Sequence, residues 1–282
     1  MKDHILVTGA SGQLGLYLID RLLHCGMKPV AWSGTKAGEY HGVRFHQISL
    51  NQPEQIQEAL NQQKPEVIIH AGAMSGADDV RRNPELGRKI NTEATRVIAD
   101  WAGSYRARLI FTSTDLVFNG TKSFWKETDQ PEPLLEYGRT KYEAEPYVTE
   151  LANGIVVRIS LLYGPTLTGR PSFFTSTLDA LRQGQRRALF TDEWRTPLTY
   201  EHAANILSRL ATDLSEVNGI LHVGGPERIT RFQLIQRAAV EQGIDPSLID
   251  AVQASLTPMP EKRPLDVSLD TSRLRSLLSK TS

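Results

Sequence analysis

Residues 5–15 read Ile-Leu-Val-Thr-Gly-Ala-Ser-Gly-Gln-Leu-Gly, and this stretch decides the fold. The apolar run at 5–7 predicts a short buried strand, and three glycines spaced by two residues each follow it directly. In such a turn the first glycine permits the tight bend, the second lets the backbone approach a pyrophosphate, and the third lets helix pack on strand. The helix that starts here offers amide donors and a favourable dipole to phosphate. The stretch therefore predicts a dinucleotide site formed by Gly9, Ser11, Gly12, Gln13, Leu14 and Gly15.

Strand and helix patterns alternate outward from this turn. Short apolar runs at 29–32, 67–70, 109–111 and 155–157 are separated by helical patterns at 14–23, 53–60, 90–101 and 137–151. This alternation predicts an α/β fold, a Rossmann-type doubly wound parallel sheet covered by helices on both faces. Beyond residue 164 the rhythm changes to short helices and isolated strands. We therefore predict an NAD(P)-binding Rossmann domain at 1–164 and a smaller C-terminal α/β substrate-binding region at 165–282.

The composition gives no sign of nucleic-acid or membrane partners. Lys plus Arg and Asp plus Glu number 32 each in 282 residues, so the formal charge is zero. Residues 1–4 lead straight into a strand without an apolar leader, and no run approaches the roughly 20 apolar residues of a membrane span. Cys25, the single cysteine, follows Leu22 and Leu23 and is expected in the core. We predict a cytoplasmic protein; the seven histidines show no metal-binding spacing, so no metal is expected.

The end of the second strand bears on the choice of cofactor. A ribose 2′-hydroxyl is usually held there by Asp or Glu, but residues 32–36 read Trp-Ser-Gly-Thr-Lys and carry no carboxylate. Ser33, Thr35 and Lys36 offer hydroxyl and ammonium groups to a 2′-phosphate instead. NADP(H) is therefore favoured over NAD(H). The alternative is an ordinary polar loop with a solvated lysine.

Tyr137 and Lys141 are the candidate proton-transfer groups. Four residues apart, they lie on one face of the helix predicted at 137–151. A nearby ammonium is expected to lower the phenol pKa from about 10, so that the hydroxyl exchanges a proton with a carbonyl or an alcohol. Thr112, Ser113 and Thr114 end a central strand at the edge where ligands bind in such sheets. A hydroxyl there can bond a substrate oxygen, and Lys141 can bond the nicotinamide ribose. A cap, a packed tyrosine and a solvated lysine are the alternative interpretations.

The chain resembles the extended short-chain dehydrogenases/reductases, and more narrowly the dTDP-4-dehydrorhamnose reductase family. In that family NAD(P)H reduces the C4 keto group of a nucleotide sugar in dTDP-rhamnose biosynthesis. The resemblance thus implies an oxidoreductase with a nucleotide-sugar substrate. The residues that carry it are 9–15, 77–78, 83–85, 90–91, 113–120, 127–129, 131, 137–141, 145, 158–160, 195–197, 263–264 and 269–270.

Position by position, the resemblance implies roles for individual residues. Tyr137 is the general acid, Lys141 its helper, and Thr114 the hydroxyl that orients the sugar carbonyl. Asp115 and Leu161 line the sugar pocket, and Gly12, Gln13 and Leu14 hold the pyrophosphate. Trp194 and Arg195, the latter within Arg-Thr-Pro at 195–197, are candidate contacts for substrate phosphate or base, and a packed loop is the alternative. The residues expected along the cofactor's adenosine half and nicotinamide side are Ala71, Gly72, Ala73 and Thr112.

Two departures from the family pattern leave the sugar open. Ser49 precedes Leu50 where relatives commonly place Asp-Leu beside adenine, and residues 195–197 are more typical of wider family members. An epimerase or dehydratase of the same superfamily is one alternative, although Leu116 stands where dehydratases usually carry a glutamate after the active-site Thr and Asp. A non-catalytic NADP-binding regulatory subunit, like the β subunit of methionine adenosyltransferase, is another. A homodimer and a regulatory enzyme partner both stay open.

Overall fold

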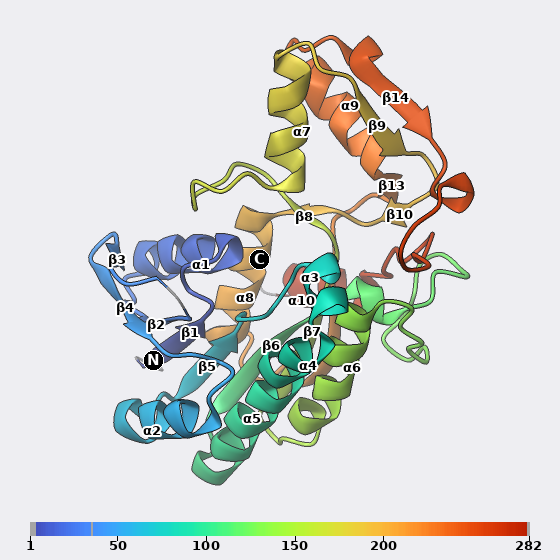
Figure 1. Cartoon of the computed structure of the whole chain (residues 1–282). Helices are drawn as coiled ribbons and strands as arrows, with labels where there is room; N and C mark the ends of the chain where they lie inside the picture. The colour runs from blue at the N-terminus through green and yellow to red at the C-terminus, as the bar shows by residue number, and fades with distance from the viewer. Residues whose placement is uncertain (1–3, 35, 281–282) are drawn as a thin grey trace.

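A large, mostly parallel sheet forms the centre of the computed structural model, which describes residues 4–34 and 36–280 (Figure 1). Within that part of the chain it has eight strands in the order β12-β7-β6-β5-β1-β2-β4-β3. All neighbours pair in parallel except β3 and β4. This confirms the predicted Rossmann-type α/β fold. The strands are β1 (Ile5–Thr8), β2 (Val30–Ser33), β3 (Glu39–Tyr40), β4 (Val43–Gln47), β5 (Val67–His70), β6 (Arg108–Thr114), β7 (Gly154–Ile159) and β12 (Gly219–Val223).

Helices cover both faces of this sheet because successive strand residues point to opposite sides. Leu6 packs with the helices of one face, whereas its neighbour Val7 packs with those of the other. The first face carries α2 (Pro53–Gln63), α5 (Ala94–Tyr105) and α6 (Glu136–Thr149). The second face carries α1 (Gln13–His24), α8 (Tyr200–Ala211) and α10 (Ser272–Ser279).

A smaller α/β region stands beyond the carboxyl ends of the strands, at the top of Figure 1. Its own apolar cluster joins α7 (Phe173–Arg182) and α9 (Arg231–Glu241) to a parallel pair, β9 (Arg187–Phe190) and β14 (Ile249–Val252). Two short pairs connect this region to the sheet. They are β8 (Leu162–Tyr163) with β11 (Leu198–Thr199), and β10 (Trp194–Arg195) with β13 (Ile229–Thr230).

The chain crosses between the two regions more than once, so a single cut at residue 164 does not separate 1–164 from 165–282. Strand β12 lies far beyond the cut yet extends the large sheet beside β7. Helix α8 packs along α1 on the same sheet. The smaller region therefore consists of the segments between these returns. The pattern of helices and strands along the sequence did not predict the return of β12 and α8, because a sheet pairs strands that are distant in the chain.

Two local expectations need correction. Cys25 is exposed and not in the core, because it is the C-cap of α1, just beyond the last buried position of that helix. The helix expected at 90–101 begins with a π-helical turn, η1 (Lys89–Glu93), after the short helices α3 (Ala77–Arg82) and α4 (Pro84–Arg88). Such turns are frequent at functional sites. Among the described residues, no helix is long and apolar enough to cross a membrane.

Candidate active site

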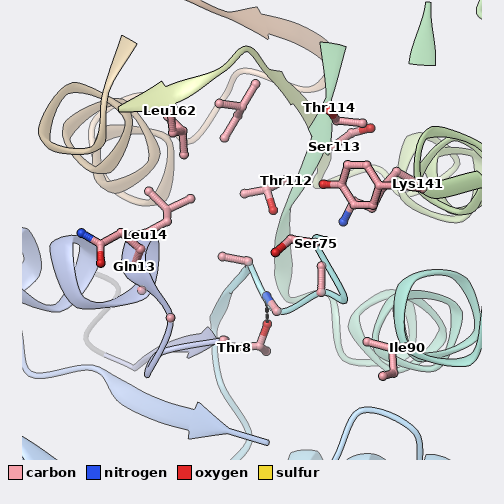
Figure 2. A pocket seen from close by; sticks show the side chains of 18 of the residues that line it. Thr8, Gln13, Leu14, Ser75, Ile90, Thr112, Ser113, Thr114, Lys141 and Leu162 are labelled. Carbon is pink, nitrogen blue, oxygen red and sulfur yellow. Dashed lines mark hydrogen bonds between the residues drawn. The ribbon is translucent and has the colours of Figure 1, made fainter. Parts of the chain in front are cut away.

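One pocket of about 780 Å³ lies at the carboxyl edge of the sheet, between the glycine-rich turn and the smaller region. Its size falls in the range of ordinary ligand pockets. In Figure 2, Gln13 and Leu14 lie on one side, and Thr112, Ser113, Thr114 and Lys141 on the other. The structure thus brings together nearly all site residues expected from the sequence. Those that line the pocket are Gly9, Ser11, Gly12, Gln13, Leu14, Gly15, Ala71, Gly72, Ala73, Thr112, Thr114, Asp115, Tyr137, Lys141, Leu161 and Arg195.

Two glycines of the turn, Gly9 and Gly15, are packed too closely to the backbone for any side chain. Gly9 has φ +67°, and a Cβ there would lie 2.6 Å from the Gly72 Cα. A Cβ on Gly15 would lie 2.3 Å from the Gly9 carbonyl oxygen. Gly12, the N-cap of α1, has no side chain to cap the helix, and the first turn carries no acidic residue. The helix N-terminus at the pocket therefore fits the pyrophosphate of a dinucleotide cofactor.

A buried network of hydrogen bonds links the end of β1 to the loop after β5, next to the glycine-rich turn. Its central residue, His70, was not expected from the sequence. The Thr95 hydroxyl donates to the Asn91 carbonyl oxygen (2.7 Å), so His70 Nε2 must donate to Thr95 Oγ1 (3.1 Å). His70 Nδ1 then accepts from the Thr8 hydroxyl (2.7 Å), which in turn accepts from the Gly72 amide (3.0 Å; Figure 2). Burial, with a smaller contribution from the Lys141 charge, lowers the pKa of His70 to about 3. The neutral ring thus fixes the loop after β5.

Ser33 and Lys36, two of the residues expected at a 2′-phosphate, do not line the pocket. Ser33 is fully buried; its hydroxyl pairs with that of Ser11 (2.8 Å) and accepts the Lys36 backbone amide (3.0 Å). Thr35 lies outside the described residues. Instead, Trp32, Gly34 and the 48–51 loop line this end of the pocket. The sequence indicated the end of β2 as part of the site. It does not show that the Ser33 side chain is buried, because that depends on its hydrogen bond with Ser11 in the glycine-rich turn.

Tyr137 retains its proton, contrary to the expectation that Lys141 lowers its pKa. Burial, followed by the Asp115 charge, raises the pKa of Tyr137 to about 12, and a hydrogen bond with Thr114 opposes this only in part. The sequence argument considered one neighbouring charge and omitted desolvation, which is the larger effect here. A protonated phenol beside the Thr114 hydroxyl is a proton donor rather than a base.

Lys141 is a buried amine whose Nζ has no hydrogen-bond partner in the described structure. It lies 4.1 Å from the centre of the Phe111 ring. Burial lowers its pKa to about 7, and the Glu145 charge opposes that shift. A buried polar nitrogen without a partner at the border of the pocket is costly unless a ligand satisfies it, and the hydroxyls of a nicotinamide ribose are groups of the right kind.

One turn beyond Lys141, Glu145 anchors α6 to the sheet. Its carboxylate accepts the Ser113 hydroxyl (2.6 Å) and a bidentate guanidinium contact from Arg158, with the shorter bond at 2.6 Å. The side chains of Glu145 and Arg158 are 3% and 2% exposed, so water does not screen the pair. This contact fixes the helix that carries Tyr137 and Lys141 against β6 and β7.

Two arginines, Arg195 and Arg231, line the pocket near Asp115. Asp115 accepts the Ser160 hydroxyl (2.9 Å) and lies 3.7 Å from Arg195 Nε. Burial raises the pKa of the Asp115 carboxyl, although Arg195 and the Ser160 hydroxyl oppose the shift. Arg231 also lines the pocket; its Nε has no hydrogen-bond partner in the described structure and lies 3.9 Å from buried Glu193. No sequence pattern pointed to Arg231, because its position in the pocket depends on the pairing of β13 with β10.

Within 4–34 and 36–280, no group of three or more His, Cys, Asp or Glu side chains is placed to hold a metal ion.

Comparisons with known proteins agree with this arrangement over nearly the whole chain. A family model described as the RmlD substrate binding domain matches residues 1–281. The crystal structure of a hypothetical dTDP-4-dehydrorhamnose reductase from Sulfolobus tokodaii is 30% identical, with a TM-score of 0.86 and 98% of this chain and 95% of that chain covered. The probable low-salt glycan biosynthesis reductase Agl14 of Haloferax volcanii is 29% identical over 289 residues, 98% of this chain and 92% of the relative. Methionine adenosyltransferase 2 subunit beta of Pongo abelii is 29% identical over 280 residues, 97% of this chain and 82% of the relative.

Proposed function

Because the chain belongs to the family of the RmlD substrate binding domain, we propose that it is an NAD(P)H-dependent reductase of a keto group on a nucleotide sugar. The activity is most like that of a dTDP-4-dehydrorhamnose reductase, the description given to its Sulfolobus tokodaii relative. The observation that carries the proposal is a protonated Tyr137 beside Thr114 and the orphaned Lys141, in the same pocket as the glycine-rich turn.

The cofactor would be held by groups already in place. The amides at the start of α1 bind the pyrophosphate, the loop of Ala71, Gly72 and Ala73 supports the adenosine half, and Lys141 Nζ bonds the nicotinamide ribose. When bound, a reduced nicotinamide supplies a hydride to the carbonyl carbon. We favour NADP(H) over NAD(H) because β2 ends without a carboxylate.

The chain's own residues then handle the proton. The Thr114 hydroxyl orients the carbonyl oxygen, and Tyr137 donates its phenolic proton to that oxygen as the alcohol forms. Lys141, if protonated, stabilises the phenolate that remains. Buried Asp115 orients Ser160 and faces Arg195 at the sugar end of the pocket.

Arg195 and Arg231 support a nucleotide sugar as the substrate class. Both arginines line the pocket, and the carboxylate nearest to Arg231, that of buried Glu193, is 3.9 Å from Arg231 Nε. Guanidinium forks bind diphosphate oxygens well, so an anionic substrate linked through a diphosphate would satisfy them.

The direct test follows NADPH consumption with a panel of dTDP- and UDP-linked 4-keto-6-deoxy sugars. We expect turnover with at least one, and loss of about 10²–10⁴ in kcat for Tyr137→Phe with unchanged NADPH affinity. An enzyme that binds NADPH and turns over none of the panel contradicts the proposal. Tightly held NAD that is recycled without net consumption would instead indicate an epimerase or dehydratase.

A second function is favoured by one comparison. The β subunit of methionine adenosyltransferase 2 aligns with 97% of this chain, so a regulatory subunit that binds NADP is the competing proposal. It predicts a stable complex with a purified methionine adenosyltransferase catalytic subunit and no keto-sugar reduction. Analytical ultracentrifugation of the mixture, with and without NADPH, distinguishes the two.

A further inference from the structure

The side chain of Gln13 turns away from the centre of the pocket. In Figure 2 its amide nitrogen is directed away from Thr112, toward the outer edge. Gln13 Nε2 donates to the Pro165 carbonyl oxygen (2.6 Å), and Gln13 Oε1 accepts the successive backbone amides of Leu167 (3.1 Å) and Thr168 (3.3 Å). Both ends of the carboxamide are therefore used by a segment more than 150 residues away in the chain.

This segment, residues 165–170, which we call the strap, follows β8 and leads to α7. Tyr17, one helical turn after Gln13, donates a hydrogen bond to the same Pro165 oxygen (3.0 Å). The Tyr17 ring is itself stacked on Tyr200, with centroids 5.5 Å apart. In the described structure, the hydrogen bonds between the strap and the rest of the chain go to Gln13 or Tyr17.

The strap has little else to hold it. Pro165, Gly169 and Arg170 are exposed, and the remaining polar contacts are internal, such as Thr166 Oγ1 to the Arg170 carbonyl (2.8 Å). Leu167 adds a partial apolar contact with the core. Local opening is easiest where few contacts hold a segment, so two side chains of α1 control whether the strap stays closed.

We propose that Gln13, which itself lines the pocket, is a positioning residue whose hydrogen bonds hold the strap beside the cofactor site, and that opening of this contact, the clasp, limits the exchange of the nicotinamide cofactor. The inference rests on the proposed function, since it concerns the same cofactor. In this assignment the backbone amides of α1 bind the pyrophosphate, and the Gln13 side chain acts through the strap.

The first test is made without cofactor, by hydrogen–deuterium exchange of peptides that cover 162–172. Gln13→Ala removes the acceptor of the Leu167 and Thr168 amides, so their exchange should accelerate by about 10- to 100-fold. Gln57→Ala, an exposed glutamine on α2, is the matched control and should leave the strap unchanged. Equal strap exchange in Gln13→Ala and the wild type overturns the clasp, whether or not the protein binds cofactor.

The second test measures NADPH association and release by stopped-flow fluorescence. If the clasp gates exchange, Gln13→Ala should accelerate both steps by about 10-fold and change the Kd much less. Tyr17→Phe should have the same effect in smaller measure, although Tyr17 does not line the pocket. Faster release alone in Gln13→Ala, with Tyr17→Phe equal to the wild type, would mean that Gln13 binds the cofactor directly and would overturn the gating. If the wild type binds neither NADPH nor NADH, the proposed function is refuted, and the gating with it. Hydrogen–deuterium exchange of the strap, measured without cofactor, still tests whether Gln13 holds the strap.

Discussion

Glu145→Gln tests the buried ion pair that supports the proton-donating helix. The substitution keeps the shape of the side chain but removes the charge that faces Arg158, which is 2% exposed. Breaking one side of a buried pair costs about 3–5 kcal/mol, because the other charge stays buried without compensation. The Ser113 hydroxyl, 2.6 Å from the carboxylate, also loses its charged acceptor. We therefore expect the free energy of unfolding to fall by about 3–5 kcal/mol.

Urea denaturation followed by circular dichroism measures this loss. With an m-value of about 3 kcal/mol/M, the midpoint should fall by about 1–2 M. Glu143→Gln is the matched control on the same helix: its pair with Arg88 spans 3.2 Å, and the two side chains are 30% and 49% exposed, so the substitution should cost less than about 1 kcal/mol.

A double variant separates the charge from the packing. Glu145→Leu with Arg158→Met removes both charges and should be more stable than either single substitution, since no charge is then left unpaired. Equal midpoint shifts for Glu145→Gln and Glu143→Gln would refute the reasoning, because burial would then make no difference to the pair.

Three further predictions concern the pocket. The pKa of Lys141 is about 7 in the folded chain and 10.5 ordinarily, so between these pH values the unfolded chain binds a proton that the folded chain releases. The free energy of unfolding therefore rises with pH across this range. Lys141→Met should stabilise the cofactor-free protein most below pH 7 and least above pH 10.5, as measured in thermal melts. Gly15→Ala places a Cβ 2.3 Å from the Gly9 oxygen and should cost about 1–3 kcal/mol, whereas Gly103→Ala meets only the flexible Leu151 side chain at 3.1 Å and should be neutral in the same melts. Arg231→Met should raise the KM for the nucleotide sugar about 10-fold or more and leave the NADPH Kd unchanged; an unchanged KM would exclude a substrate contact.

The residues of the pocket divide into those that local spacing reveals and those that it does not. The glycine-rich turn, Thr114 and the Tyr137–Lys141 pair were all identifiable, because each is a short motif beside a recognisable strand or helix. Arg231 was not, since it reaches the pocket only through strand pairing between segments far apart in the chain. Ser33 was expected in the pocket and does not line it, for a related reason: the direction of its side chain depends on its hydrogen bond with Ser11.

The α/β alternation, the glycine-rich turn and the one-turn spacing of Tyr137 and Lys141 can all be recognised in the sequence, because backbone periodicity and glycine geometry act over a few residues. Tertiary structure alone decided that β12 and α8 return to the large sheet and that Gln13 faces the strap. It also decided the direction of the Tyr137 pKa, which rises through burial although an ammonium lies one turn away. Desolvation and long-range pairing depend on the groups that surround a residue in space, and these cannot be read from its neighbours in the sequence.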